Sequence, residues 1–296
     1  MVAHRFLAAA LAAGLVWAPL HAKGPVTLQP VSEWEMGDPS PDGCTVVRFF
    51  GSEENVHVLR LQQNYPSTGM EFWAAGPAFR NFTIFEGVKL QLREDGRKAT
   101  LRPVAGMLPG FGKAVIGTMS QNQITGEPDA PRATEDSRAK GAMMLDPERG
   151  ASAEFVSLQR GSDPAVRLET GGLEVPFAML NRCTQDLLAQ WGLDPDKHRT
   201  ASRGVNWRNQ TAITRKVLGS YREAGLATGE RGRINVRLIV DETGKVRDCT
   251  VLKSAATEKL NSPVCKIMAE AQFDPALDAE GRPFDSFYAT AVTYQT

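Results

Sequence analysis

The chain has 296 residues, 42% of them hydrophobic and 23% charged, with 34 basic residues against 34 acidic ones. This is the composition of a globular protein large enough for about two domains with a sizeable core. The balanced charge gives no support to a nucleic acid or another polyanion as partner.

The first residues have the pattern of a secretory signal. Met1 to Arg5 precede fifteen apolar or small residues, Phe6 to Leu20, and His21-Ala22-Lys23 follow. A membrane-spanning helix needs about 20 apolar residues, so we expect a signal peptide at 1–22, cleaved after Ala22, and an exported protein. The alternative is a retained membrane anchor. The cleaved chain would carry 33 bases and 34 acids, a net charge of −1.

Four cysteines, Cys44, Cys183, Cys249 and Cys265, fit this export. Thiols pair in oxidising compartments, so we expect two disulfides rather than buried free thiols. Three connectivities are possible. Local pairing of Cys249 with Cys265 would leave Cys44 and Cys183 to each other.

Residues 23–195 indicate a strand-rich first domain. Short runs rich in β-branched and aromatic residues alternate with turn signals such as Gly51-Ser52 and Asp95-Gly96. The expected strands read CTVVRFF, VHVLRLQ, FTIFEGVKLQL, KATLRPV, AEFVSLQ and AVRLE, and the polar insertion from Thr125 to Lys140 reads as a loop. We expect a sheet or sandwich of unknown role.

A helix should close this domain. Phe177, Leu180, Leu187, Leu188 and Trp191 fall on one face, Pro176 suits the first turn, and Gly192 ends the helix. Cys183 lies on it, so a bond to Cys44 would tie the last element to the first strand. The polar stretch that follows predicts a linker over 196–210.

Residues 211–296 predict a small second domain with the order β, β, α, β behind a helix. Ile213, Val217 and Tyr221 mark that first helix. In RINVRLIV, apolar residues alternate with Arg233, Asn235 and Arg237, which predicts a strand with one buried face. Gly244 turns the chain into a second strand, VRDCTVLK. Asn261 should cap a short helix that carries Val264, Ile267 and Met268, and SFYATAVTY is the last strand. The fold class is therefore α+β.

The second domain resembles the C-terminal domain of the TonB family. The residues that carry the resemblance are GRINVRLIVDETGKVRDCTVLKS, then Leu260-Asn261 before a helix, then Phe273, Pro275 and Ala276. The match covers about 85 residues, from Thr211 to Tyr294, less than a third of the chain. The cysteine pair on strand and helix resembles variants of this domain in some bacterial TonB-like proteins.

The resemblance implies a protein-binding domain without catalytic residues. In the family, the last strand or its edge pairs with a short extended segment of an outer-membrane transporter, and an unpaired strand edge is suited to such addition. The corresponding edge here is Ser286, Phe287, Tyr288, Ala289, Thr290, Ala291, Val292, Thr293 and Tyr294. For single side chains such as Val292 and Tyr294, core packing is the better expectation. An exposed edge also leaves a homodimer open.

Groups that carry chemistry are sparse. After cleavage only His57 and His198 remain, in different domains, which argues against a histidine metal site or a triad. Ser137 and Lys140 form an S-x-x-K in the polar insertion, which we take as coincidence. We therefore expect no catalytic residue, no metal and no cofactor.

The remaining motifs have structural explanations. GFGKAVIG, from Gly110, lacks the end of a phosphate loop and predicts a hairpin or bulge. The acid pairs Asp241 with Glu242 and Asp278 with Glu280 fall in turns, where solvated acids are expected. Phe72 and Trp73 could line a ligand groove, although core packing is the better expectation.

Three functions remain. The first is an exported periplasmic TonB-like interaction protein, not an enzyme, that takes part in TonB-dependent transport by binding a transporter or another protein. The second is a periplasmic enzyme or small-ligand binder with its active domain at 23–195. The third is an energy transducer anchored in the inner membrane and facing the periplasm, although the chain has a folded domain where the family's transducers have a proline-rich spacer.

Overall fold

The computed structural model describes residues 24–38, 40, 43–82, 87–126, 144–224, 232–256 and 263–294, and within these the side chains of 221–224, 232–233, 253–256 and 293–294 are left undescribed. The expected signal peptide, most of the insertion with Ser137 and Lys140, and the expected cap Asn261 lie outside these ranges. None of the helices in the described ranges has the length and hydropathy to cross a bilayer.

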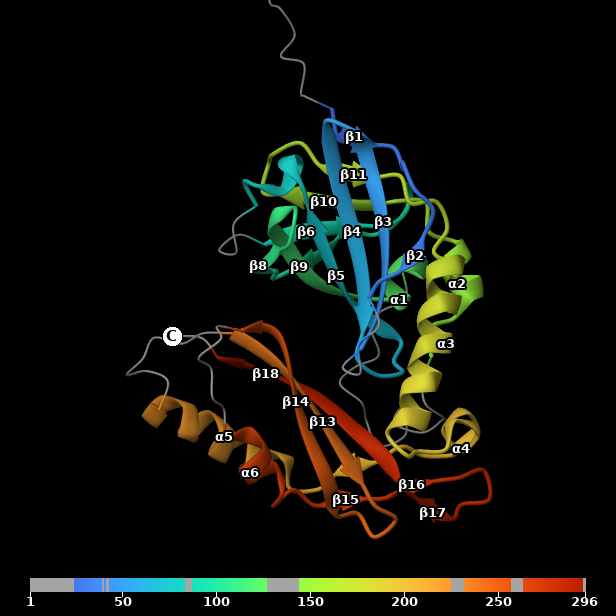
Figure 1. The fold of residues 1–296 in the computed structure, drawn as a ribbon, viewed down its shortest axis with the longest axis vertical. Helices are drawn as coiled ribbons and strands as arrows, with labels where there is room; N and C mark the ends of the chain where they lie inside the picture. Colours follow the sequence, from blue (N-terminus) through green and yellow to red (C-terminus); the bar gives the residue numbers. More distant parts are fainter. Residues whose placement is uncertain are drawn as a thin grey trace, which may run out of the picture.

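The first domain contains two sheets, drawn in the upper half of Figure 1. One has five strands in the order β1-β11-β10-β6-β7. Its strands are β1 (Val26–Leu28), β6 (Val88–Gln91), β7 (Ala99–Leu101), β10 (Val156–Arg160) and β11 (Val166–Leu168). β1 pairs with β11 in parallel, and the other neighbours are antiparallel.

The other sheet is antiparallel and has six strands in the order β2-β3-β4-β5-β9-β8. Its strands are β2 (Glu35–Met36), β3 (Cys44–Ser52), β4 (Asn55–Gln63), β5 (Gly69–Ala75), β8 (Val104–Leu108) and β9 (Gly112–Ser120). The stretch KATLRPV, expected as one strand, is divided between β7 and β8, because Pro103 has no N–H for a central ladder.

The core lies between the two sheets. Alternation puts Leu59, Leu61 and Phe72 on the inner face of the six-stranded sheet, where they meet Leu90 and Leu158 of the other. Phe72 is therefore a core residue. Short helical segments cover the ends of the sheets: η1 (Pro77–Phe79), α1 (Asn122–Thr125) and α2 (Pro147–Ala151).

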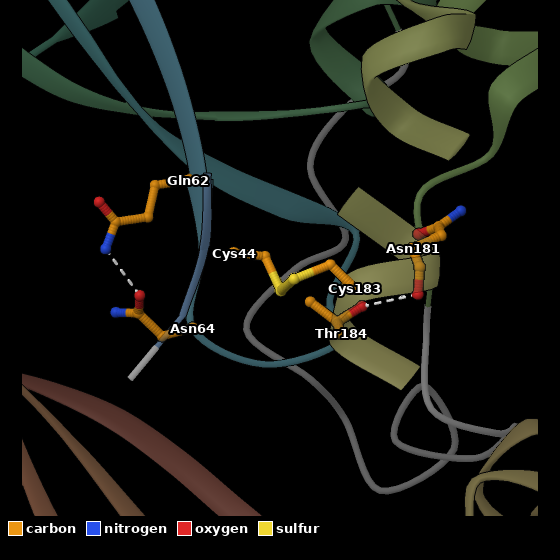
Figure 2. Close-up of a disulfide and its surroundings, with 6 residues drawn as sticks. All are labelled: Cys44, Gln62, Asn64, Asn181, Cys183 and Thr184. Atoms are coloured by element: carbon orange, nitrogen blue, oxygen red, sulfur yellow. Dashed lines mark hydrogen bonds between the residues drawn. A yellow bond between two sulfur atoms is a disulfide. The ribbon is translucent and has the colours of Figure 1, made fainter. Parts of the chain in front are cut away.

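Helix α3 (Glu174–Gln190) closes this core, as its apolar period predicts. Phe177, Leu180 and Leu187 are buried against the sheets. Cys183 is bonded to Cys44 of β3, and Figure 2 shows the disulfide between strand and helix. The covalent bond therefore joins the last element of the domain to the sheet.

The expected linker contains structure. Asp194 caps helix α4 (Pro195–Thr200) by accepting hydrogen bonds from the N–H groups of Asp196 and Lys197. A proline at the first helical position suits this arrangement, so Asp194-Pro195 starts a helix where the pattern indicated only the end of one. Strand β12 (Asn206–Trp207) then pairs with β15 (Phe273–Asp274).

The second domain has the predicted order, with α5 (Gln210–Ala224), β13 (Gly232–Val240), β14 (Val246–Ala256), α6 (Val264–Met268) and β18 (Ser286–Tyr294). Its antiparallel sheet has the order β14-β13-β18. The joint before β18 forms the two-residue strands β16 (Ala276–Leu277) and β17 (Pro283–Phe284), which pair with each other.

The turn between β13 and β14 requires glycine. Gly244 has φ of 82°. A Cβ at this position would lie 2.0 Å from the carbonyl oxygen of Phe273. The turn is therefore packed against the joint that precedes β18.

A disulfide joins β14 to α6 through Cys249 and Cys265. On the same face of the sheet, Ile234, Val236 and Leu238 pack with residues of α5 and α6 in one core. The two disulfides match the pairing in which Cys249 takes its local partner.

Candidate binding edge and domain junction

Strand β18 lies at an edge of the C-terminal sheet. It pairs with β13 from Val240↔Ser286 to Gly232↔Tyr294 without a shift of register. Its other side pairs with no strand in the described part of the chain. In an antiparallel strand, alternate residues direct their N–H and C=O groups away from the partner, so this side offers a row of main-chain donors and acceptors.

Several side chains of β18 pack against other parts of the same chain. Val292 and Tyr288 belong to the core below α5 and α6, as expected of Val292, whereas the side chain of Tyr294 is outside the described set. Ala289 and Thr290 are half-buried, and Ala291 is exposed. Among the residues of β18 whose side chains are described, Ala291 is therefore the one that is exposed.

The first residue of β18 is fixed by His198 of α4. Nδ1 of this ring lies 2.7 Å from the carbonyl oxygen of Asp194, and Nε2 lies 3.0 Å from Oγ of Ser286. A carbonyl can only accept, so Nδ1 carries the proton and Nε2 accepts from the hydroxyl. Burial lowers the pKa of His198, and the hydrogen bond to Asp194 and the Asp194 carboxylate only partly offset this.

The next residue, Phe287, lies where the two domains meet. Its ring is 5.9 Å from that of Trp191, at the end of α3, and 6.0 Å from that of Tyr65, in the loop between β4 and β5. Leu188, Leu193 and Ile239 pack with it in one buried cluster. The first domain therefore contacts the face of the sheet opposite to α5 and α6.

This contact changes the expected environment of β13. Arg237 and Asn235 are each only 9% exposed, although the alternation predicted a single buried face. Arg237 lies 4.2 Å from the ring of Trp191, where the guanidinium and the indole face attract each other. Asn235 and Arg237 thus lie against the first domain and not in solvent.

In the turns, Asp241 and Asp278 accept hydrogen bonds from main-chain N–H groups. Oδ1 of Asp241 accepts from the hydroxyl and N–H of Thr243 and the N–H of Lys245, and these hydrogen bonds lower its pKa. Burial opposes ionisation of Asp278, but hydrogen bonds and charge from Arg282 outweigh it, and the pKa of Asp278 is lowered. Both carboxylates are structural.

The other candidate residues are also structural. His57 is fully buried, with Nδ1 3.0 Å from the carbonyl oxygen of Asn55 and Nε2 accepting from the N–H of Ala78. Burial lowers the pKa of His57. Gly110 belongs to the turn between β8 and β9, as the hairpin interpretation requires. Within the described ranges, no group of three or more His, Cys, Asp or Glu residues is arranged to hold a metal ion.

The residues of the junction were missed by sequence reasoning. His198 fell within the expected linker, and Trp191 was assigned only to the core face of α3. One signal was present: the polar face of β13 ends in Ile239, an apolar residue that a solvated face does not need.

Comparison with known proteins identifies the second domain. Residues 220–296 match the family described as Gram-negative bacterial TonB protein C-terminal. Searches among curated proteins and among solved structures gave no match for the chain.

Proposed function

Since the C-terminal region of the chain, over residues 220–296, is a TonB C-terminal domain, we propose that this is a periplasmic protein of the cell envelope that binds an extended protein segment along β18. The family to which this domain belongs consists of protein-interaction modules without catalytic function. We extend that to the whole chain and propose that it is not an enzyme.

The one-sided pairing of β18 carries this proposal. The strand is held along its length by β13 on one side. Its core side chains fix its position, and its outer main-chain groups are suited to a further strand. An added segment would be held by main-chain hydrogen bonds, which make few demands on its sequence.

We propose a periplasm-facing segment of a TonB-dependent outer-membrane transporter as the partner, which places the protein in TonB-dependent transport. The first domain separates this binding module from the N-terminus, where we propose that a signal peptide is removed. Intact mass of the protein from a periplasmic fraction, with and without reduction, tests this. A species starting at Lys23 without free thiols is expected, whereas one that retains the first residues would favour the anchored transducer.

Two adjacent proline substitutions test strand addition. Successive residues of β18 direct their N–H groups to opposite sides, so of Thr290→Pro and Ala291→Pro one removes a bond to β13 and the other removes an outward donor. Proline is tolerated at the open side of an edge strand. We expect the outward variant to retain its melting temperature and to bind a transporter-derived peptide at least about ten-fold more weakly, since several main-chain bonds depend on this register.

The probe is a synthetic peptide that copies the periplasm-facing segment of such a transporter, titrated into the full oxidised protein. Val292→Pro is unsuitable, because Val292 is part of the core. Ala291→Ser is the matched control and should bind as the unaltered protein does. If the variant with the unchanged melting temperature binds normally, the edge is not the binding site. Concentration-dependent dimerisation that this variant abolishes would instead assign the edge to a second copy of the chain.

A further inference from the structure

A cavity of about 280 Å³ lies at the junction of the two domains. We call it the junction pocket. Its walls come from the last residues of β4, the first residues of β5, the last residues of β9 and, across the junction, Asn235 of β13. Ligand sites are common between domains, where side chains of two units converge.

The lining of the junction pocket excludes several ligand classes. No lysine, arginine or histidine is among its lining residues, and Glu71 is its one acid. Phosphates and carboxylates are bound by cationic groups, and hard cations need several oxygen ligands. Two methionines and one tyrosine are its large apolar residues, too few for a lipid chain. A neutral, polar ligand remains.

Several lining residues have hydrogen-bonding atoms to which no described residue bonds. The side chain of Asn235, 9% exposed, makes no hydrogen bond with them. Asn64 accepts at Oδ1 from Gln62, which leaves its Nδ2 as a donor. Glu71 accepts from Trp73 at Oε1, which leaves Oε2 as an acceptor. None of these atoms is fully buried without a partner, so they reach solvent and are accessible to a ligand.

The wall of the pocket is held in place before any ligand binds. Nε2 of Gln63 donates to the carbonyl oxygens of Ser67 and Gly69 at 2.8 and 2.7 Å. Gln63 also pairs with Cys44, whose disulfide joins β3 to α3. Figure 2 shows Gln62 and Asn64 directed to one side of the strand, away from this disulfide. A site on such a framework requires little ordering when it binds.

We propose that the junction pocket binds a neutral saccharide. A sugar hydroxyl both donates and accepts, and the carboxamides of Asn64 and Asn235 offer the same pair of functions. Oε2 of Glu71 accepts a further hydroxyl. The ring of Tyr65, half-buried at the pocket, provides an apolar surface for the C–H face of a sugar ring. This inference does not depend on strand addition at β18.

Calorimetric titration of the full oxidised protein tests the proposal, with chitotetraose, cellotetraose and maltotetraose as probes at millimolar concentration. We expect saturable binding of at least one. Asn235→Ala and Glu71→Gln should each weaken it about five-fold, the effect of one lost hydrogen bond. Glutamine at position 71 retains an acceptor for Trp73. Asn81→Ala, at an exposed turn outside the lining of the pocket, is the matched control.

Thermal unfolding checks that each variant is folded. If a variant is not, the side-chain amide signals of Asn64 and Asn235 in the unaltered protein provide the second measurement. They should shift on addition of the saccharide that binds. Absence of saturable binding for all three probes overturns the proposal. So does binding that neither substitution weakens and that leaves both amide signals in place.

Discussion

A buried, neutral histidine joins α4 to β18. His198 is 3% exposed and contacts the rings of Phe284 and Phe287 as well as its two hydrogen-bond partners. Protonation would replace the acceptor at Nε2 by a donor and place a charge among aromatic rings. Because burial holds the pKa of His198 below its usual 6.5, the unfolded chain binds the proton more readily than the folded one.

The lowered pKa of His198 makes the folded protein less stable at low pH. This histidine should contribute fully to stability above about pH 6.5, and the contribution should be lost progressively below that value. We predict a fall in the melting temperature between pH 7.5 and 5.5, and weaker protection from hydrogen exchange, relative to the intrinsic rate at each pH, at the first residues of β18. His198→Gln retains a donor and an acceptor but does not titrate, so it should flatten this dependence.

His57 is the necessary control, because burial also lowers its pKa and it titrates in the same range. His57→Gln should reduce the pH dependence of the first domain without changing exchange at β18. If His198→Gln and the unaltered protein show the same exchange at both pH values, His198 does not fix the strand.

At the scale of single residues, the sequence predicted roles that depend on chain neighbours. Asp241 and Gly244 shape a turn, as their local pattern indicates, and Cys249 has its nearest cysteine as partner. The role of His198 depends on Ser286, 88 residues further along the chain. No local pattern contains that information.

At the scale of elements, α6 is too short to be stable by itself. It has five residues, and its first turn has no side-chain cap. Helices of this length depend on tertiary contacts, which here include the buried Val264 and Met268 and the disulfide from Cys265 to β14. The disulfide should therefore contribute strongly to the stability of the second domain.

Removal of this disulfide gives a measurable prediction. The closed loop spans 16 residues, and in the chain-entropy model its loss costs about 3 kcal/mol. Cys265→Ser should lower the melting temperature of the second domain by about 10 °C or more, measured by circular dichroism. Cys249→Ser with Cys265→Ser controls for the thiol left by the single change and should behave alike. An unchanged melting temperature in both would show that α6 is held by packing alone.

Most helices and strands could be predicted from the sequence, but several of their end points could not. Helix α3, strand β13 and strand β18 follow from clear periods of apolar residues. The division of KATLRPV into β7 and β8 depends on which sheet each half joins. Helix α4 was missed because its six residues are mostly polar, although Asp194-Pro195 was a signal for its start.

At the scale of the whole molecule, the C-terminal sheet is covered on both faces. Helices α5 and α6 bury one face, and the first domain contacts the other through Trp191 and Phe287. Figure 1 shows α3 extending from the first domain toward α4 beside the second. The sequence could not show this packing, because Asn235 and Arg237 are polar residues, and their alternation with apolar residues is typical of a face in solvent. Strand addition would then have to use an edge of this sheet, and β18 is one of its two edge strands.

Trp191 is central to this junction, since its ring contacts both Phe287 and the guanidinium of Arg237. Trp191→Ala removes both contacts and leaves the side chain of Arg237 more exposed to solvent. We predict that the two domains then separate in part, with a larger radius of gyration by small-angle X-ray scattering, while each retains its own core. Val175→Ala, at an exposed position of the same helix, should leave the scattering unchanged. Identical scattering for both variants would mean that the other junction contacts, from His198, Ile239 and Leu188, are sufficient to hold the domains together.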